Sequence, residues 1–349
     1  MKKIIVAVFS GALIYLGLVE YGFSQSPFYE GKTITVVQIV GAGGTGDMRR
    51  KALFPFLQKY IPGNPTIISD YMPGGGGRKA ANYIYRVARA DGLTIGGMSA
   101  SLVTNAILDT AGVQYDIDKL IYLGSPVSIF HYIFLTRKEA GLNSLEKLRS
   151  AQGVRIGGQE VGHDVYITAR LFAYLLALKD PKFVLGYGGP EMDVALMRGE
   201  IDARATTPET LSQRNADWIE KGLTDLHAIV EVPKGNKAAR FERLPELEDF
   251  AGSEKERKLL MMYRAFRLVG TPYILPPGTP KPQVQILQEA MRKAYRDPGF
   301  HKEFKKLAGF DASPLMPEEQ EKVIRDLPRD KETVELFRKL SGPDPLPAR

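Results

Sequence analysis

The chain has 349 residues, of which 44% are hydrophobic and 25% are charged, so it can form one large globular domain or two smaller ones. Its formal net charge is +7, from 47 basic and 40 acidic residues. The two signs are mixed along the chain, and no basic block is dense enough to predict nucleic-acid binding. The absence of cysteine excludes disulfides, thiol catalysis and thiolate metal sites.

The first 24 residues have the pattern of a secretory signal peptide. Two lysines precede an uncharged apolar run at 4–19, and small residues at Gly22 and Ser24 favour cleavage before Gln25. The apolar run is shorter than the about 20 residues that a membrane-spanning helix needs, so an uncleaved anchor is only the alternative. We therefore expect an exported, periplasmic protein.

From residue 32 onward, short β-branched runs alternate with amphipathic stretches, which is typical of a parallel sheet covered by helices. In the first part of the chain we expect strands at 34–40, 66–71 and 93–98, and helices at 47–60 and 79–90. The middle part repeats this scheme, with strands at 120–123, 132–136, 154–157, 183–187, 201–206 and 226–230, and helices at 144–151, 164–177 and 190–198. Ser144 and Asp164 are the expected N-caps of the first two of these helices. The last part is predicted to hold helices at 282–295, 298–307 and 317–327, and then a frayed proline-rich tail at 342–349.

A glycine-rich loop, Gly41-Ala42-Gly43-Gly44-Thr45-Gly46, follows the first predicted strand and precedes the first helix. Glycines let the backbone approach a ligand closely, and the free N–H groups at a helix start favour an anion. The spacing of the glycines also fits a dinucleotide-binding loop, with Asp70 placed as its ribose-binding acid. Because the leader directs the chain out of the cytoplasm, a carboxylate is preferred over NAD; a purely structural turn is the other alternative.

A second glycine cluster, Gly74-Gly75-Gly76-Gly77, follows the second predicted strand. Neighbouring parallel strands end at one edge of the sheet, where open α/β folds bind their ligands. We therefore expect the two glycine loops to line one crevice. Ser99 follows one predicted strand and Thr206 is at the end of another, so both are placed to reach this crevice, although the threonine has a turn-forming role as its alternative.

No catalytic or metal-binding motif is evident in the sequence. The segment Gly97-Met98-Ser99-Ala100-Ser101 lacks the final glycine of a nucleophile elbow. The four histidines are scattered without the spacing of metal ligands. Arg204 lies within a predicted strand, and a structural pair with an acid is favoured over contact with a ligand. We predict no catalytic residue, no metal and no cofactor.

Several short segments follow one another in a characteristic order between residues 28 and 325. They are residues 29–34, 43–49, 61–65, 72–77, 81–85, 90–96, 187–202 and 276–280. In their order and spacing, the chain resembles the periplasmic substrate-binding proteins of tripartite tricarboxylate transporters, the Bug receptors. Within this resemblance, 43–49 corresponds to the first glycine loop of the family, with its acid Asp47 and the basic Arg49, and 72–77 corresponds to the second.

This resemblance implies an α/β fold of the two-lobed periplasmic-binding-protein (Venus flytrap) kind, type II-like, whose lobes close on a ligand. The lobes would comprise residues 26–126 with 269–349, and residues 127–268. The implied function is that of an exported receptor, not an enzyme, which captures a small organic acid for membrane transporter subunits or a sensor protein. We expect a monomer that binds no nucleic acid. An exported α/β enzyme acting on a similar acid is the alternative.

The glycine loops and the resemblance together give a set of candidate ligand-binding residues. They are Gly43, Gly44, Thr45, Asp47, Gly75, Gly76, Gly77, Ser99, Gly158, Gly162, His163, Asp164 and Thr206. The loop at 158–164 departs from the family, because it carries Glu160 and Asp164 where small hydroxyl residues are usual. If both acids were ionised and faced the crevice, they would repel a second carboxylate, although His163 could offset this as a donor. The ligand is therefore left open among mono-, di- and tricarboxylates, aromatic acids and less anionic solutes.

Overall fold

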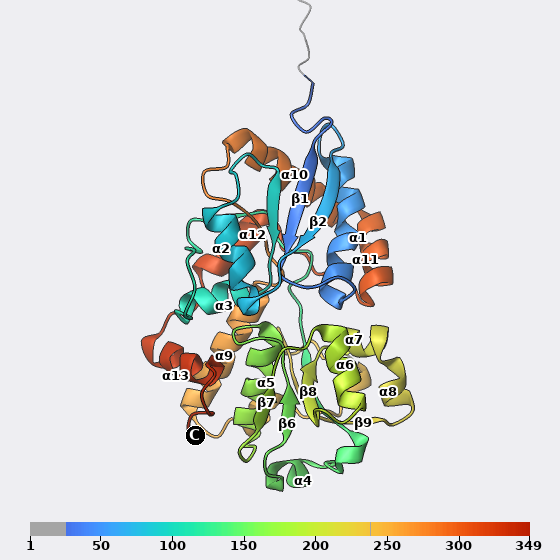
Figure 1. The fold of residues 1–349 in the computed structure, drawn as a ribbon, viewed down its shortest axis with the longest axis vertical. Coiled ribbons are helices and arrows are strands. Elements are labelled where there is room, and N and C mark those ends of the chain that lie inside the picture. The colour runs from blue at the N-terminus through green and yellow to red at the C-terminus, as the bar shows by residue number, and fades with distance from the viewer. Residues whose placement is uncertain (1–25, 238) are drawn as a thin grey trace, which may run out of the picture.

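The computed structural model describes residues 26–237 and 239–349, so the predicted signal peptide at 1–24 lies outside the described residues. Two five-stranded sheets, each flanked by helices, form two lobes that lie one above the other in Figure 1. Within the described ranges, the helices are all too short or too polar to cross a membrane.

The first sheet has the strand order β2-β1-β3-β10-β4. Its strands are β1 (Thr33–Gln38), β2 (Thr66–Tyr71), β3 (Thr94–Gly97), β4 (Ile121–Tyr122) and β10 (Tyr273–Leu275). Strand β1 pairs in parallel with β2 and β3, whereas β10 runs antiparallel to β3 and β4. The helices of this lobe are α1 (Thr45–Tyr60), α2 (Arg78–Arg86), α3 (Ser101–Ile107), α10 (Lys281–Arg296), α11 (Pro298–Ala308) and α12 (Pro317–Arg325).

The second sheet repeats the plan of the first, with the order β7-β6-β8-β5-β9. Its strands are β5 (Tyr132–Arg137), β6 (Arg155–Gly157), β7 (Lys182–Val184), β8 (Ala203–Thr206) and β9 (Thr224–Val230). Here β6 pairs in parallel with β7 and β8, whereas β5 runs antiparallel to β8 and β9. The helices around this sheet are α4 (Leu145–Ser150), α5 (Asp164–Leu175), α6 (Gly189–Met197), α7 (Pro208–Arg214), α8 (Ala216–Glu220) and α9 (Glu254–Leu268).

The chain passes between the lobes three times. It enters the second lobe from β4 to β5, returns from α9 to β10, and enters it again from α12 to α13 (Lys331–Ser341). Helix α13 packs against α5 and α9, although the predicted division assigns residues 331–349 to the first lobe. The division into lobes by residue range stays a prediction.

The apolar core of the second lobe lies on both faces of its sheet. Alternate side chains of β5 point to opposite faces, as the period of a strand requires. Phe134 stacks on Phe172 of α5, with ring centroids 5.5 Å apart. Ile133 and Leu135 instead join the cluster around Met192 of α6. A fully buried strand of this kind reads as a continuous apolar run rather than as an alternating one.

Local sequence explains where two helices of the second lobe begin. Ser144 caps α4 by accepting a hydrogen bond from the Lys147 N–H, which confirms the predicted cap. For α5 the predicted cap, Asp164, is wrong by one residue. His163 takes that role, because its Nδ1 accepts a hydrogen bond from the Val165 N–H at 3.2 Å. The Asp164 carboxylate is thereby left to another partner.

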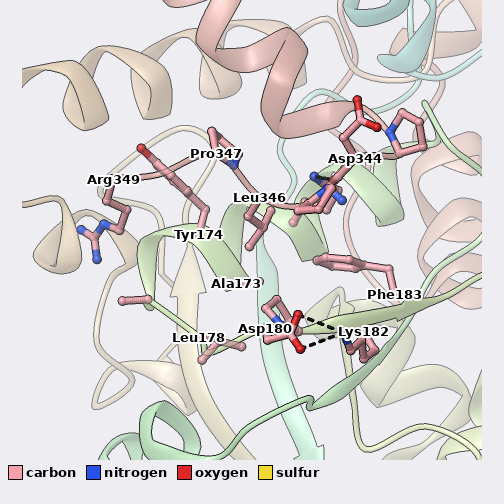
Figure 2. Close-up of a pocket in the computed structure, with 15 residues that line it drawn as sticks. Ala173, Tyr174, Leu178, Asp180, Lys182, Phe183, Asp344, Leu346, Pro347 and Arg349 are labelled. Carbon is pink, nitrogen blue, oxygen red and sulfur yellow. Dashed lines mark hydrogen bonds and ion pairs between the residues drawn. The ribbon is translucent and has the colours of Figure 1, made fainter.

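The C-terminal tail is tied to the second lobe, so the prediction of a frayed tail is wrong. In Figure 2 the tail, from Asp344 to Arg349, runs along a pocket of about 490 Å³ next to α5. The buried Arg170 of α5 donates to the Asp344 carbonyl at 2.6 Å. Arg349 forms an ion pair with Glu256 of α9 at 2.6 Å. These contacts offset the entropy that a proline-rich terminus loses when it is ordered.

Candidate functional site

A cavity of about 620 Å³ lies between the two lobes. The first lobe lines it with the glycine loop before α1 and with Ser99, and the second lobe lines it with the loops that precede α5, α6 and α7. The wall is completed by Phe130 of the link from β4 to β5, by Tyr132 at the start of β5, and by Arg267 of α9. This volume suits a small molecule, since ligand pockets usually measure about 300–1,000 Å³.

The first lobe contributes the start of a helix to the cavity wall. Helix α1 begins at Thr45, and its N-cap is Gly44, which has extended backbone angles and no side chain with which to cap the helix. The first N–H groups of an α-helix have no partner inside the helix. These groups, together with the helix dipole, make the cavity wall at Gly44, Thr45 and Gly46 favourable for an anion.

Gly43 and Asp47, both candidate ligand-binding residues, do not line this cavity. The Asp47 carboxylate is fully buried and accepts hydrogen bonds from the Gly43 N–H and the Tyr71 hydroxyl, both at 2.9 Å. It also pairs with Lys51 at 2.8 Å. Burial would raise the pKa of Asp47, but the Lys51 ammonium and the two donors lower it overall. Asp47 therefore fixes the glycine loop against β2 as an ionised anchor.

The second glycine cluster, Gly74–Gly77, lies outside the cavity and contacts the opposite lobe. Its member Gly76 donates its N–H to the Glu160 carboxylate at 2.8 Å. A Cβ on Gly76 would lie 2.5 Å from the carbonyl carbon of Gly162, and the φ of Gly76 is +64°. Asn105 of α3 donates to the carbonyls of both Gly76 and Gly162, at 3.3 and 3.1 Å. The second glycine cluster thus forms a contact between the lobes beside the cavity. The candidate residue Gly162 lies on the other side of this contact.

The remaining candidates divide between the cavity and its surroundings. Those that line the cavity are Gly44, Thr45, Ser99, His163, Asp164 and Thr206. Gly158 does not line it, because its N–H pairs with the Val184 carbonyl at 2.9 Å. The Thr206 hydroxyl is buried without a hydrogen-bond partner, which leaves it free for a ligand. Thr45 and Thr210 face each other from opposite lobes, with their hydroxyl oxygens 3.4 Å apart.

Both acids of the loop at 158–164 have partners, but only Asp164 is paired with a cation. Asp164 forms a buried ion pair with Arg267 of α9 at 2.6 Å. Burial would raise the pKa of Asp164, but the Arg267 guanidinium lowers it overall. Glu160 accepts from the Gly76 N–H on the other lobe. The charge of Asp164 is therefore offset, whereas Glu160 lines the cavity with only a backbone donor as its partner. Arg267 carries no sequence motif by which it could have been predicted as the partner of Asp164.

Arg204 pairs with an acid, as the sequence favoured. Its guanidinium contacts the Asp193 carboxylate of α6, and Arg214 of α7 pairs with the other oxygen of that carboxylate at 2.8 Å. Arg214 also donates to the Thr45 hydroxyl at 3.4 Å. One carboxylate thus connects β8, α6 and α7, and through Arg214 this network reaches the start of α1.

The cavity contains serine, histidine and aspartate, but these residues do not form a catalytic triad. In a triad the histidine links the serine to the carboxylate. Here the Ser99 hydroxyl lies 2.9 Å from that of Ser101, and His163 Nδ1 accepts from a backbone N–H. Asp164 is engaged by Arg267. Among the described residues, no three histidine or acidic side chains gather closely enough to hold a metal ion.

Comparison with known proteins supports the fold. No protein-family model and no curated protein matches the sequence. Among solved structures, the periplasmic binding protein BugD is 20% identical, with a TM-score of 0.68, and the alignment covers 89% of this chain and 98% of BugD. MatC from Rhodopseudomonas palustris with bound malate is 19% identical, with a TM-score of 0.67 and coverage of 89% and 99%. An R. palustris protein with adipate is 17% identical, with a TM-score of 0.61 and coverage of 84% and 93%. The predicted two-lobed α/β fold of periplasmic binding proteins is confirmed.

Proposed function

We propose that this protein is an exported solute-binding receptor of the tripartite tricarboxylate type, with no chemistry of its own. It captures a small organic acid between its lobes and presents the closed form to a membrane transporter or a sensor protein. The observation that carries the proposal is the cavity of about 620 Å³, whose wall comes from both lobes. A ligand that contacts both walls favours the closed arrangement over an open one.

The charges around the cavity favour an anionic ligand. Among the residues that line the cavity, arginines outnumber acids. The arginines are Arg49, Arg50, Arg204, Arg214 and Arg267, and the acids are Glu160, Asp164 and Glu191. The start of α1 adds N–H donors and the positive end of a helix dipole. The malate in MatC and the adipate in the second R. palustris protein are small dicarboxylates held by the same fold, which makes this the class to test first.

Export and presentation to a membrane partner belong to the same proposal. A leader at 1–24 supports transfer to the periplasm, where no disulfide is needed because the chain buries a large hydrophobic core. The contact between Gly76 and the second lobe supports a closed form whose surface differs from that of an open one. A partner that reads the closed surface would bind the loaded receptor selectively.

A thermal-shift experiment tests the proposal. The mature chain from Gln25 is heated with malate, succinate, adipate, citrate, benzoate, glutamate or NAD, and each hit is titrated by calorimetry. Ligand at 100 times its Kd should add about 2.7 kcal/mol to the free energy of unfolding. Binding of one class of acid, recovered unchanged after incubation, is the expected result. Binding of NAD alone would contradict the proposal, and conversion of a bound acid would favour the enzyme alternative.

A further inference from the structure

One arginine in the cavity is held by two aromatic rings. The guanidinium carbon of Arg49, in the second turn of α1, lies 4.9 Å from the ring centroids of both Phe130 and Phe310. Phe130 belongs to the link between β4 and β5, and Phe310 follows α11. The Arg49 side chain lines the cavity, and the residue is 8% exposed. Two rings orient a planar guanidinium and attract its charge without cancelling it.

The other arginines of the cavity are already engaged. Arg50 donates to the carbonyls of Gly97 and Met98, Arg204 and Arg214 contact the Asp193 carboxylate, and Arg267 contacts the Asp164 carboxylate. Arg49 forms no ion pair in the described part of the chain, and its Nε is buried without a hydrogen-bond partner. A buried charge is costly unless it is paired. An anion that binds beside Arg49 therefore gains more binding free energy than one beside an arginine that already has a partner.

The acid that acts most strongly on Arg49 is Glu209, at the start of α7 on the opposite lobe. Burial lowers the pKa of Arg49 to about 10, and Glu209 opposes that shift, so the guanidinium stays charged at neutral pH. Glu209 Oε2 is itself buried without a hydrogen-bond partner. The two opposite charges therefore act on each other without a hydrogen bond, which leaves the donors of Arg49 free for an incoming carboxylate.

We propose that Arg49 binds an anionic group of the ligand directly, as an ion pair that its two flanking rings orient. The proposal rests on the proposed function and deepens it. The N–H groups at the start of α1 hold one carboxylate, while Arg49, beside the link between the lobes, holds a second. The ligand class that follows is a small dicarboxylate, and the receptor distinguishes it from the corresponding monoacid through Arg49.

The test compares diacids with their monoamides by calorimetry. The probes are succinate, malate and adipate with their monoamides, and the proteins are the wild type, R49Q, R49K and the control R89Q. Arg89 is exposed, so R89Q removes the same charge far from the cavity. The wild type should prefer a diacid over its monoamide by about tenfold or more, since a charge-assisted hydrogen bond is strong. R49Q should lose most of this preference, R49K should keep part of it, and R89Q should match the wild type.

Two further readouts separate binding from folding. Because R49Q also removes the charge that faces the buried Glu209 carboxylate, the melting temperature of each ligand-free variant is measured beside its affinity, and R49Q/E209Q should melt no lower than the wild type. E209Q should bind the diacid more tightly, because it removes the acid that competes for Arg49. A lower melting temperature of R49Q with unchanged affinity would assign Arg49 a structural role and overturn the inference alone. If the wild type binds none of the acids, the proposed function fails, and this inference fails with it.

Discussion

The two lobes share one sheet plan, yet they bring different chemistry to the cavity between them. The first lobe offers a glycine loop, an uncapped helix start at Gly44 and the guanidinium of Arg49, which forms no ion pair in the ranges that the structure describes. The second lobe offers side chains whose charges are paired, with Asp164 on Arg267 and Asp193 on Arg204. This difference indicates that ligand affinity depends mainly on the first lobe, whereas stability depends on the buried pairs and core of the second. The predictions below test that separation.

The largest expected effect is on stability, from Arg267→Met in the second lobe. The substitution leaves the Asp164 carboxylate buried and unpaired, which typically costs about 3–5 kcal/mol. Urea unfolding measures the loss. The matched control is Lys221→Met, which breaks the exposed pair with Asp217 and should change stability by less than about 1 kcal/mol. Equal stability of the two variants would contradict the role assigned to the buried pair.

A second effect on stability comes from His227, which is buried beside Thr136 of β5. Burial lowers the pKa of His227 from 6.5 to about 4. The unfolded chain therefore takes up the proton first, and the contribution of neutral His227 is complete above pH 6.5 and is lost as the pH falls toward 4. The loss should approach about 3 kcal/mol, at about 1.4 kcal/mol per pKa unit.

The free energy of unfolding, measured from pH 7.5 to 4, checks the His227 prediction. In His227→Gln the decline between pH 6.5 and 4 should be smaller by about that amount, because the replacement does not titrate. Identical pH profiles of the variant and the wild type would show that His227 takes up its proton at the same pH in the folded and the unfolded chain, which would contradict the prediction.

In the first lobe, Gly76→Ala should weaken ligand binding by about tenfold or more. The added Cβ would lie 2.5 Å from the carbonyl carbon of Gly162, so the lobes could not close fully. Gly43→Ala is a matched control, because Gly43 also has a positive φ, +80°, but open space around the added atom. Both variants should lose about 1–2 kcal/mol of stability from left-handed strain. Only Gly76→Ala should lose affinity, and equal affinities would contradict the closing contact.

The smallest effect on stability is expected for Gly44→Asp. Aspartate is a better helix N-cap than glycine by a few tenths of a kcal/mol, so α1 should become slightly more stable. The new charge faces the cavity and should weaken the binding of an acid by about fivefold, which corresponds to about 1 kcal/mol. Gly44→Asn adds the cap without the charge and should bind more tightly than Gly44→Asp. Equal binding by these two variants would place the ligand away from α1.

Much of the fold was predictable because its signals are local. The predicted helix at 47–60 corresponds to α1, and the serine cap of α4 at Ser144 is a contact between residues three apart. Helix α13 was not predicted, although it has a local signal of the same kind: Asp330 caps it by accepting a hydrogen bond from the Thr333 N–H. The tail was predicted to fray because its partners, Arg170 and Glu256, are far from it in the sequence.

The cavity was predictable only in part. Strand ends followed by glycines indicated a crevice, and Thr45 and Ser99 indeed line the cavity. The two glycine loops look equivalent in the sequence, but one lines the cavity and the other meets Gly162, because that outcome depends on how the lobes lie against each other. The partner of Asp164 was equally invisible, since Arg267 reaches it from a distant helix. An ion pair between residues that are far apart in the chain has no characteristic spacing in the sequence, so it cannot be predicted from a motif.

Three passages between the lobes are an odd number, so the two ends of the described chain belong to different lobes. Tyr29 near the N-terminal end bonds to the Gly92 carbonyl of the first lobe, and Arg349 is pinned to Glu256 of the second. The two ends of the described chain accordingly lie far apart in Figure 1. Because the sequence contains no cysteine, one cysteine added at each end would take a fluorescent dye without any background labelling. Fluorescence energy transfer between dyes at the two ends would report the distance between the lobes and follow each opening and closing in real time.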